Sequence, residues 1–227
     1  MKLSLTREEL ASYCASLVDA QFPDGRTHEI GRVVDRALDR LEYCFSRVSL
    51  RGYRVDGGAC FDHLHGDQFA MFVYWLANSA WRDFGDDALA KKFTLLNRAR
   101  HALLIMYDTQ LPDIFLIPHT VGTVIGKGTY ADFLVVCQNV TIANDLTTHL
   151  TFGRGVVLFP GAFVVGKGTI GEASAITANS TIQYLDIPPN TIASGRSPDV
   201  ELRPRKRDFL ARYFLPPYPG HEGNINQ

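Results

Sequence analysis

LFPGAFVVGKGTIGEASAITANSTI, residues 158–182, carries an aliphatic side chain at every sixth position. The five residues of this series are Leu158, Val164, Ile170, Ile176 and Ile182. An α-helix repeats about every 3.6 residues and a strand every two, so a period of six indicates short strands that each turn a corner. Three such strands make one triangular coil, and stacked coils bury one aliphatic from each side. The segment therefore predicts a three-sided β-solenoid.

The same rhythm is present further upstream, at Val124, Tyr130, Val136 and Ile142. It is lost in residues 143–155, ANDLTTHLTFGRG, which are too polar and irregular for a wall of the solenoid. We expect this whole segment to form a loop outside the coil. After Ile182, the prolines of residues 187–200, IPPNTIASGRSPDV, predict that the chain leaves the solenoid, because proline fixes its own backbone angle.

Helical patterns fill the first half of the chain. Thr6, followed three residues later by a glutamate, is typical of a capping box at the start of one helix. A second predicted helix carries apolar residues at i, i+3 and i+4 spacing over residues 30–48. Asp67 is a candidate N-cap for a third helix whose apolar residues face inward as far as Trp81. A fourth helix is expected over residues 87–107.

The composition changes near Leu111, where β-branched residues, glycine and threonine replace the helical pattern. We therefore predict an α+β fold in three parts. Residues 1–110 form a helical N-terminal domain, and residues 111–202 form the solenoid domain. Residues 203–227 form a C-terminal tail that contains one short helix at residues 207–214 and ends in disorder.

Composition and charge argue against several classes of protein. The 23 basic and 24 acidic residues give a net charge of −1, so we expect no nucleic-acid partner. No apolar run reaches the length of a membrane span, and MKLSLTREEL at the N-terminus lacks the apolar stretch of a signal peptide. The four cysteines are scattered, which is typical of reduced thiols in a cytoplasmic protein. Residues 62–67, DHLHGD, lack the spacing of a full ligand set, so we expect a polar loop and no metal.

Four stretches carry a resemblance to a known family: IPHTVGTVIGKG (117–128), CQNVTI (137–142), FPGAFVVGKGTIGEASAITANSTI (159–182) and IPPNTIASGRSPDV (187–200). They resemble the hexapeptide-repeat acyltransferases, and among these most of all the serine acetyltransferases. The resemblance covers about residues 67–202. It implies a left-handed parallel β-helix that forms homotrimers, with acetyl-CoA as acyl donor and the active site between adjacent solenoids. The helical domain could pair two trimers into a hexamer, and the sequence does not decide this.

The resemblance also assigns catalytic roles. His119 in PHTVG matches the general base, and His149 in THLTFGRG matches a second histidine that holds the acceptor. Histidine suits general-base chemistry, because an unperturbed imidazole has a pKa of about 6.5 and is largely neutral near pH 7. A carboxylate should orient the base, with Asp113 as the first candidate and Asp108 as the second. Plain alternatives stay open, in which His119 caps the end of the solenoid and His149 is an ordinary loop residue.

The donor site follows from the same resemblance. Pro160, Gly161 and Ala178 match small residues along the pantetheine groove, and Asn144 matches a residue at the mouth of the groove. Arg196 is a candidate for the 3′-phosphate of coenzyme A, together with the basic run Arg203, Arg205, Lys206 and Arg207. Structural alternatives stay open for both groups. Tight corners could by themselves require the small residues, and the basic residues could form a solvated charged face.

Two departures bear on the acceptor. Pro118 replaces the family's acidic residue that contacts the serine amine, and Thr148 replaces the arginine that pairs with the serine carboxylate. Their absence argues against free L-serine. We predict acetyl-CoA-dependent transfer of an acetyl group to a small hydroxyl-bearing acceptor. The alternatives are acetylation of a sugar or sugar nucleotide for surface polysaccharide, and a β-helix protein that serves in assembly without catalysis.

Overall fold

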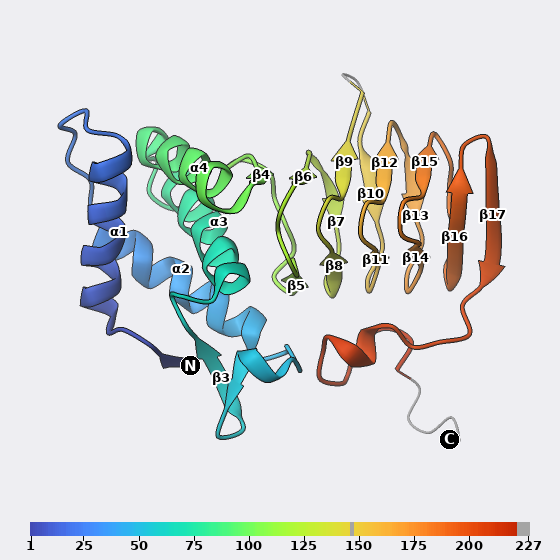
Figure 1. The fold of residues 1–227 in the computed structure, drawn as a ribbon, viewed down its shortest axis with the longest axis horizontal. Coiled ribbons are helices and arrows are strands. Elements are labelled where there is room, and N and C mark those ends of the chain that lie inside the picture. Colours follow the sequence, from blue (N-terminus) through green and yellow to red (C-terminus); the bar gives the residue numbers. More distant parts are fainter. Residues whose placement is uncertain (146–147, 222–227) are drawn as a thin grey trace.

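A helical region occupies one end of the molecule and a parallel β-solenoid occupies the other (Figure 1). The computed structural model describes residues 1–145 and 148–221. The predicted order of helices followed by a three-sided solenoid is therefore confirmed. The left-handed sense of the coil stays a prediction.

The helical region consists of α1 (Arg7–Gln21), α2 (Ile30–Phe45), α3 (Gly66–Arg82) and α4 (Asp87–His101). The helix α1 begins at the predicted capping box, in which Thr6 Oγ1 accepts from the backbone N–H of Glu9 and the Glu9 side chain accepts from that of Thr6. The α3 helix packs against both α2 and α4, and it is buried at every position from Gln68 to Ala80. A short η1 turn (Arg51–Tyr53) follows α2. A small sheet then joins β2 (Arg54–Val55) and β3 (Gly58–Phe61) to β1 (Lys2–Leu3), which precedes α1 in the chain.

Three details of the helical prediction are wrong. His65, not Asp67, holds the N-cap position of α3, and Asp67 lies in the first turn of that helix. Trp81 is 37% exposed instead of facing inward. The α4 helix ends at His101, because Ala102 adopts a left-handed backbone conformation with φ of 48°. The apolar residues that follow belong to β4 (Leu103–Ile105), the first strand of the solenoid.

The solenoid strands form three columns of parallel neighbours. The first column contains β4, β6 (Thr123–Ile125), β9 (Thr141–Ala143), β12 (Phe163–Val165) and β15 (Thr181–Gln183). The second contains β5 (Phe115–Leu116), β8 (Leu134–Val136), β11 (Val157–Leu158), β14 (Ala175–Ile176) and β16 (Thr191–Arg196). The third contains β7 (Gly128–Tyr130), β10 (Leu150–Phe152) and β13 (Gly168–Ile170).

The six-residue rhythm describes the core of the solenoid. Its five aliphatics lie in consecutive strands from β11 to β15, and each is at most 1% exposed. Val157 pairs with Ala175 and Phe163 pairs with Thr181, so neighbouring coils are 18 residues apart. Three sides of six residues make one such coil. Each of these five strands thus buries its aliphatic side chain of the series, as the rhythm predicted. Upstream, Tyr130, Val136 and Ile142 are buried as predicted, whereas in β6 the buried aliphatic residue is Ile125 and the predicted Val124 is partly exposed.

The predicted outer loop of residues 143–155 is shorter than expected. Leu150–Phe152 forms strand β10, and Phe152 is fully buried in the core. Leu150 pairs with Gly168, 18 residues later, and with Gly128, 22 residues earlier, so four extra residues lie between β9 and β10. Residues 146 and 147 of this loop lie outside the described residues.

The end of the chain also differs from the prediction. The segment after Ile182 stays in the solenoid, since β16 continues the second column and β17 (Asp199–Pro204) pairs antiparallel with it. The chain then runs back toward the helical region (Figure 1), where the Leu215 N–H donates to the carbonyl oxygen of Arg47 at 2.7 Å. In place of the expected helix there is only a 3₁₀ turn, η2 (Leu210–Arg212). The expected disorder at residues 222–227 lies outside the described residues.

This returning segment covers one face of the solenoid. Phe209 contacts Phe159 with 5.3 Å between ring centroids, and Phe214 contacts Phe133 at the same distance. The strands β5, β8, β11 and β14 of the covered column are buried at every position, whereas strands of the other columns leave residues partly exposed. The segment is therefore part of the folded body.

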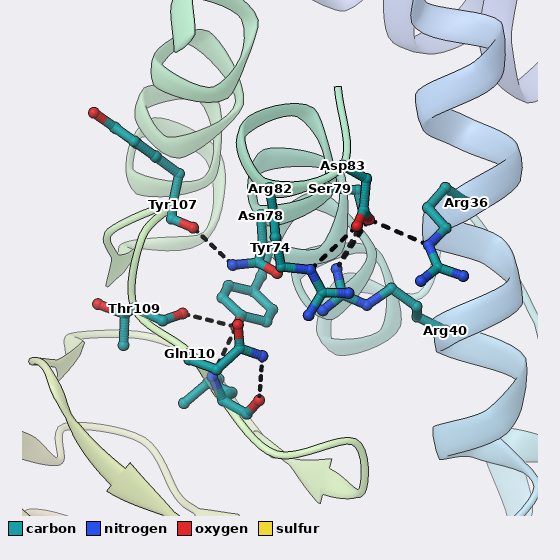
Figure 2. Close-up of polar contacts among 11 residues, drawn as sticks. Arg36, Arg40, Tyr74, Asn78, Ser79, Arg82, Asp83, Tyr107, Thr109 and Gln110 are labelled. Atoms are coloured by element: carbon teal, nitrogen blue, oxygen red, sulfur yellow. Dashed lines mark hydrogen bonds and ion pairs between the residues drawn. The ribbon is translucent and has the colours of Figure 1, made fainter. Parts of the chain in front are cut away.

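Backbone carbonyl groups attach α3 to the first coil (Figure 2). Tyr74 Oη donates to the carbonyl oxygen of Thr109 at 2.9 Å and accepts from the N–H of Leu111 at 3.0 Å. Asn78 Nδ2 donates to the carbonyl oxygen of Tyr107 at 2.8 Å. All three carbonyl or amide groups belong to the link between β4 and β5. These bonds fix the position of α3 against the solenoid.

Candidate functional site

His119 lies at the corner between β5 and β6. Leu116 pairs with Val135 of the next coil, and Val124 pairs with Thr141 of that coil. The chain therefore advances eight residues from Leu116 to Val124 at this corner, but six residues from Val135 to Thr141 at the equivalent corner of the next coil. The two extra residues make the corner bulge outward. His119 adopts a left-handed conformation there with φ of 57°, and its side chain is 75% exposed. The bulge thus presents an imidazole to the outside of the solenoid.

Asp67 is the carboxylate beside His119. The backbone N–H of His119 donates to Asp67 Oδ2 at 2.9 Å, and His119 Nδ1 lies 3.7 Å from the same oxygen. Asp67 comes from the first turn of α3, 52 residues earlier in the chain. A carboxylate at this distance can stabilise the imidazolium that forms when the ring accepts a proton. Sequence analysis missed this pairing, because a lone aspartate at a helix start carries no sign of a partner so far away.

A cavity of about 520 Å³ opens next to His119. Its walls come from four parts of the chain: the η1 turn, the start of α3, the corners of the solenoid and the returning C-terminal segment. The polar residues that border it are Arg51, Tyr53, His65, Asp67, His119, Gln138, Arg212 and Tyr213. The cavity therefore combines an imidazole that can act as a base with a carboxylate, two guanidinium groups, a second imidazole and two phenol groups.

Two polar atoms in this cavity wall lack a partner. Tyr53 Oη and His65 Nδ1 are buried and form no hydrogen bond within the described part of the chain. Their rings contact each other edge to face with 5.4 Å between centroids, and burial raises the pKa of the Tyr53 hydroxyl well above its usual value. Because an unsatisfied buried polar atom costs about 1–3 kcal/mol, such atoms often mark a place where a ligand binds.

The second histidine lies elsewhere in the single chain. His149 borders a separate cavity of about 240 Å³, together with Lys167, Tyr184 and Asp186. Asn144 accompanies His149, since its Nδ2 atom lies 3.3 Å from His149 Nδ1 and also donates to the carbonyl oxygen of Lys127. The chain alone therefore does not bring His119 and His149 into one cavity.

The two carboxylates expected to orient His119 have other surroundings. Asp108 forms an ion pair with Lys127 at 2.6 Å. Asp113 is exposed and borders two other cavities, one lined by Gly128 and Arg154 and one lined by arginines of the helical region. Neither borders the cavity of His119. Within one chain the structure places Asp67 in the position that we had expected for Asp113 or Asp108.

The residues expected to bind coenzyme A divide into two groups. Pro160 borders the His119 cavity, and its carbonyl oxygen accepts from the N–H of Asn179 in the next coil, beside the exposed Ala178. Gly161 has φ of 73°, and a Cβ atom there would lie 2.3 Å from Asn179 Oδ1, so the corner itself requires glycine. Arg196 is exposed at the end of β16 and does not border that cavity. The stacked corners form a continuous edge next to His119.

Two further findings concern the whole described chain. Among residues 1–145 and 148–221, no group of three or more histidine, cysteine, aspartate or glutamate side chains could hold a metal ion. None of the helices in this part of the chain combines the length and the apolar character that crossing a bilayer requires.

Solved structures with a similar fold are serine acetyltransferases. The enzyme from Vibrio cholerae O1 biovar El Tor is 19% identical with a TM-score of 0.64, over 87% of this chain and 79% of that one. The Brucella abortus enzyme in complex with coenzyme A is 15% identical with a TM-score of 0.64, over 88% and 83%. The soybean enzyme complexed with serine is 20% identical with a TM-score of 0.58, over 75% and 69%. Identities this low show a shared fold. No protein-family model and no curated protein sequence matches the chain.

Proposed function

We propose that this protein is an acetyl-CoA-dependent O-acetyltransferase in which His119 acts as the general base. The observation that carries the proposal is the exposed imidazole of His119 at a bulged corner, held by Asp67 and facing a cavity of about 520 Å³. The fold shared with serine acetyltransferases, one of them solved with coenzyme A, supports acetyl-CoA as donor. An enzyme that uses this donor would work in the cytoplasm.

His119 would remove the proton from the acceptor hydroxyl while the hydroxyl oxygen attacks the carbonyl carbon of the thioester. As the carbon–sulfur bond breaks, the imidazolium returns the proton to the departing thiolate, which gives an acetyl ester and free coenzyme A. Asp67, 3.7 Å from Nδ1, would stabilise the imidazolium between the two steps. A base of this kind contributes about 10²–10⁴-fold to the rate.

The donor groove belongs to an assembly of several chains in this proposal. Pro160, Gly161 and Ala178 would allow the pantetheine arm to approach the stacked corners. Asn144 would contact coenzyme A at the mouth of the groove, and Arg196 would contact its 3′-phosphate. A homotrimer would set the His119 corner of one solenoid against the His149 edge of the next. Such an arrangement would give His149 its role in holding the acceptor, although the two histidines lie in different cavities of one chain. Two trimers could pair through the helical region.

The cavity suggests an acceptor that carries a negative charge. Arg51 and Arg212 border it, and Asp67 is its one bordering carboxylate in the described chain. Tyr53 Oη and His65 Nδ1 offer two more polar contacts. Pro118 and Thr148 stand where the family has the two charged residues that recognise serine. A negatively charged acceptor other than free serine therefore fits the polar residues of this cavity better. The arginines thereby favour a sugar nucleotide, whose phosphates would pair with them, as the second candidate for the acceptor.

The test is release of free thiol from acetyl-CoA with a panel of amino acids, sugars and sugar nucleotides. We expect turnover with at least one hydroxyl acceptor, and a fall of about 10²–10⁴-fold in His119→Ala. The control is His221→Ala, which changes an exposed histidine that does not border the cavity. Undiminished turnover in His119→Ala would rule out this base. A wild-type protein that consumes no acetyl-CoA with any acceptor would support the non-catalytic alternative instead.

A further inference from the structure

Three arginines converge on a second cavity, of about 400 Å³, at the junction of α2 and α3. Arg36 and Arg40 come from α2, and Arg82 comes from the last turn of α3 (Figure 2). This cavity shares no bordering residue with the cavity of His119. Anything that binds here is therefore separate from the proposed catalytic site.

One carboxylate, that of Asp83, contacts all three guanidinium groups. Asp83 Oδ2 accepts from Arg36 Nε at 3.2 Å and lies 3.9 Å from Arg40 Nη1, while Asp83 Oδ1 accepts from Arg82 Nε at 3.2 Å. The dashed lines in Figure 2 show how these contacts meet at Asp83. A single negative charge cannot neutralise three positive charges.

Two other carboxylates, Asp39 and Asp113, border the cavity itself. Asp39 is 2.9 Å from Arg7 Nη2, and the other amino group of Arg7 pairs with Asp35 at 3.0 Å. Asp113 is exposed at the rim, and no ion pair of Asp113 is seen within the described chain. Asp35 shares Arg7 with Asp39, so the arginines and carboxylates in and around the cavity balance in number. The cavity is therefore distinguished by three converging guanidinium groups and not by a net charge.

Arg40 is the buried member of the three. It is 8% exposed, its guanidinium lies 4.0 Å from the centre of the Trp75 ring, and Nη1 donates to Ser79 Oγ at 3.0 Å. Nη2 is buried and has no hydrogen-bond partner in the part of the chain that the structure describes. Burial, helped by the charges of Arg82 and Arg36 and opposed by Tyr74 and Asp83, lowers the pKa of Arg40 to about 10. The site thus holds a buried guanidinium group whose hydrogen bonds its own surroundings leave partly unsatisfied.

We infer that this cavity binds a small oxyanion, and that a phosphate group is the chemical class that it fits. Arginine donors in a planar fork match the oxygens of phosphate, and charge-assisted hydrogen bonds of this kind are the strong ones. Arg40 would donate from Nη2, and Arg36 and Arg82 would close over the ligand from the two helices. Tyr43, which also borders the cavity, would add a hydroxyl donor.

Calorimetric titration of the full chain with inorganic phosphate, at constant ionic strength in chloride, tests this inference. We expect saturable binding by the wild type, and affinity about tenfold or more lower in Arg36→Gln and in Arg82→Gln, because each loses a hydrogen bond to a charged group. Both side chains are partly exposed, so these variants should fold, which circular dichroism will check. Arg32→Gln is the matched control, since Arg32 lies on the same helix, is exposed and pairs with Glu29.

A parallel titration with glycerol phosphate identifies the source of the phosphate. Tighter binding than that of inorganic phosphate would indicate a phosphate carried on a metabolite, and equal binding would indicate the free ion; either result supports the site. Absence of saturable binding by the wild type would overturn the inference. So would equal affinity in wild type, Arg36→Gln and Arg82→Gln. Binding that is lost only in Arg212→Gln would overturn it too, because it would place phosphate in the His119 cavity.

Discussion

Asp67 Oδ2 accepts the backbone N–H of His119 at 2.9 Å, so the first turn of α3 and the bulged corner of the solenoid share one hydrogen bond. The corner is two residues longer than its neighbour in the next coil and adopts a left-handed conformation at His119. Further along the corner, Thr120 Oγ1 donates to the carbonyl oxygen of His101 at 3.1 Å and the Gly122 N–H donates to that of Ala102 at 3.0 Å. The orientation of the exposed imidazole therefore depends on a residue of the helical region.

Asp67→Ala should lower kcat of acetyl transfer about tenfold or more, since it removes both the hydrogen bond and the nearby negative charge. Asp67→Asn should recover part of this loss, because an asparagine oxygen can still accept from the His119 N–H. KM for acetyl-CoA should stay unchanged in both variants, because Asp67 positions the base and does not hold the donor. Steady-state kinetics measures both parameters.

Asp56→Asn serves as the control for the loss of an aspartate, because Asp56 is exposed and does not border the cavity. A merely structural role for Asp67 would show as equal loss in the alanine and asparagine variants together with a lower melting temperature. That result would contradict the positioning role.

Ile176→Ala should lower the free energy of unfolding by about 2–5 kcal/mol, because it leaves a cavity in a closely packed core. Ile176 is fully buried in β14 and belongs to the six-residue rhythm. Val121→Ala is the matched control, since Val121 is 62% exposed at a corner. Urea unfolding followed by circular dichroism measures both changes. Equal small effects in the two variants would mean that the rhythm does not describe the core.

The sequence predicted those parts of the fold that local patterns determine. The inward positions from Leu158 to Ile182 repeat with the length of a solenoid side, so their burial could be read from spacing alone. The capping box at Thr6 is likewise a pattern within four residues. Both predictions rest on residues that are close together in the chain, and both are confirmed.

Long-range contacts account for what the sequence did not reveal. Asp67 meets His119 only because Tyr74 and Asn78 fix α3 against the link between β4 and β5. Leu103 was assigned to a helix because its spacing fits one, but a left-handed Ala102 ends α4 first. Neither event leaves a local signal. For the same reason, the candidate base could be named from its motif while its partner could not.

Phe214→Ala should lower the free energy of unfolding by about 3–5 kcal/mol, as expected for a fully buried aromatic. Phe214 is 1% exposed and contacts Phe133 on the face of the solenoid that the returning segment covers. The same segment brings Arg212 to the His119 cavity, so activity should fall together with stability. Phe163→Ala is the control, because Phe163 points outward and is 38% exposed. An unchanged unfolding curve for Phe214→Ala would show that the segment does not pack on the solenoid in solution.

The free energy of unfolding should depend on pH through His101. Burial lowers the pKa of His101 below its usual value of 6.5, the charge of Arg100 lowers it further, and Asp67 opposes the shift. The unfolded chain then binds a proton at a higher pH than the folded chain does. His101 therefore reduces stability as the pH falls below about 6.5, and the loss levels off below the folded-state pKa. Urea unfolding at several values between pH 7.5 and pH 5, within the range where histidine titrates, should give a shallower dependence for His101→Leu than for wild type. Identical slopes would contradict the contribution of His101.

Mixing two inactive variants tests whether neighbouring chains share the catalytic site. His119 and His149 border different cavities of one chain, so the proposed chemistry needs a trimer in which each site takes one histidine from each of two subunits. His119→Ala and His149→Ala should each have little activity. After the two are unfolded together and refolded in equal amounts, about a quarter of the sites should regain both histidines, since each interface of a cyclic trimer draws its two subunits at random. Thiol release measures the recovery, and sedimentation should give a species of three 25.3 kDa chains. A monomer at micromolar concentration, or a trimeric mixture with no recovered activity, would contradict the shared site.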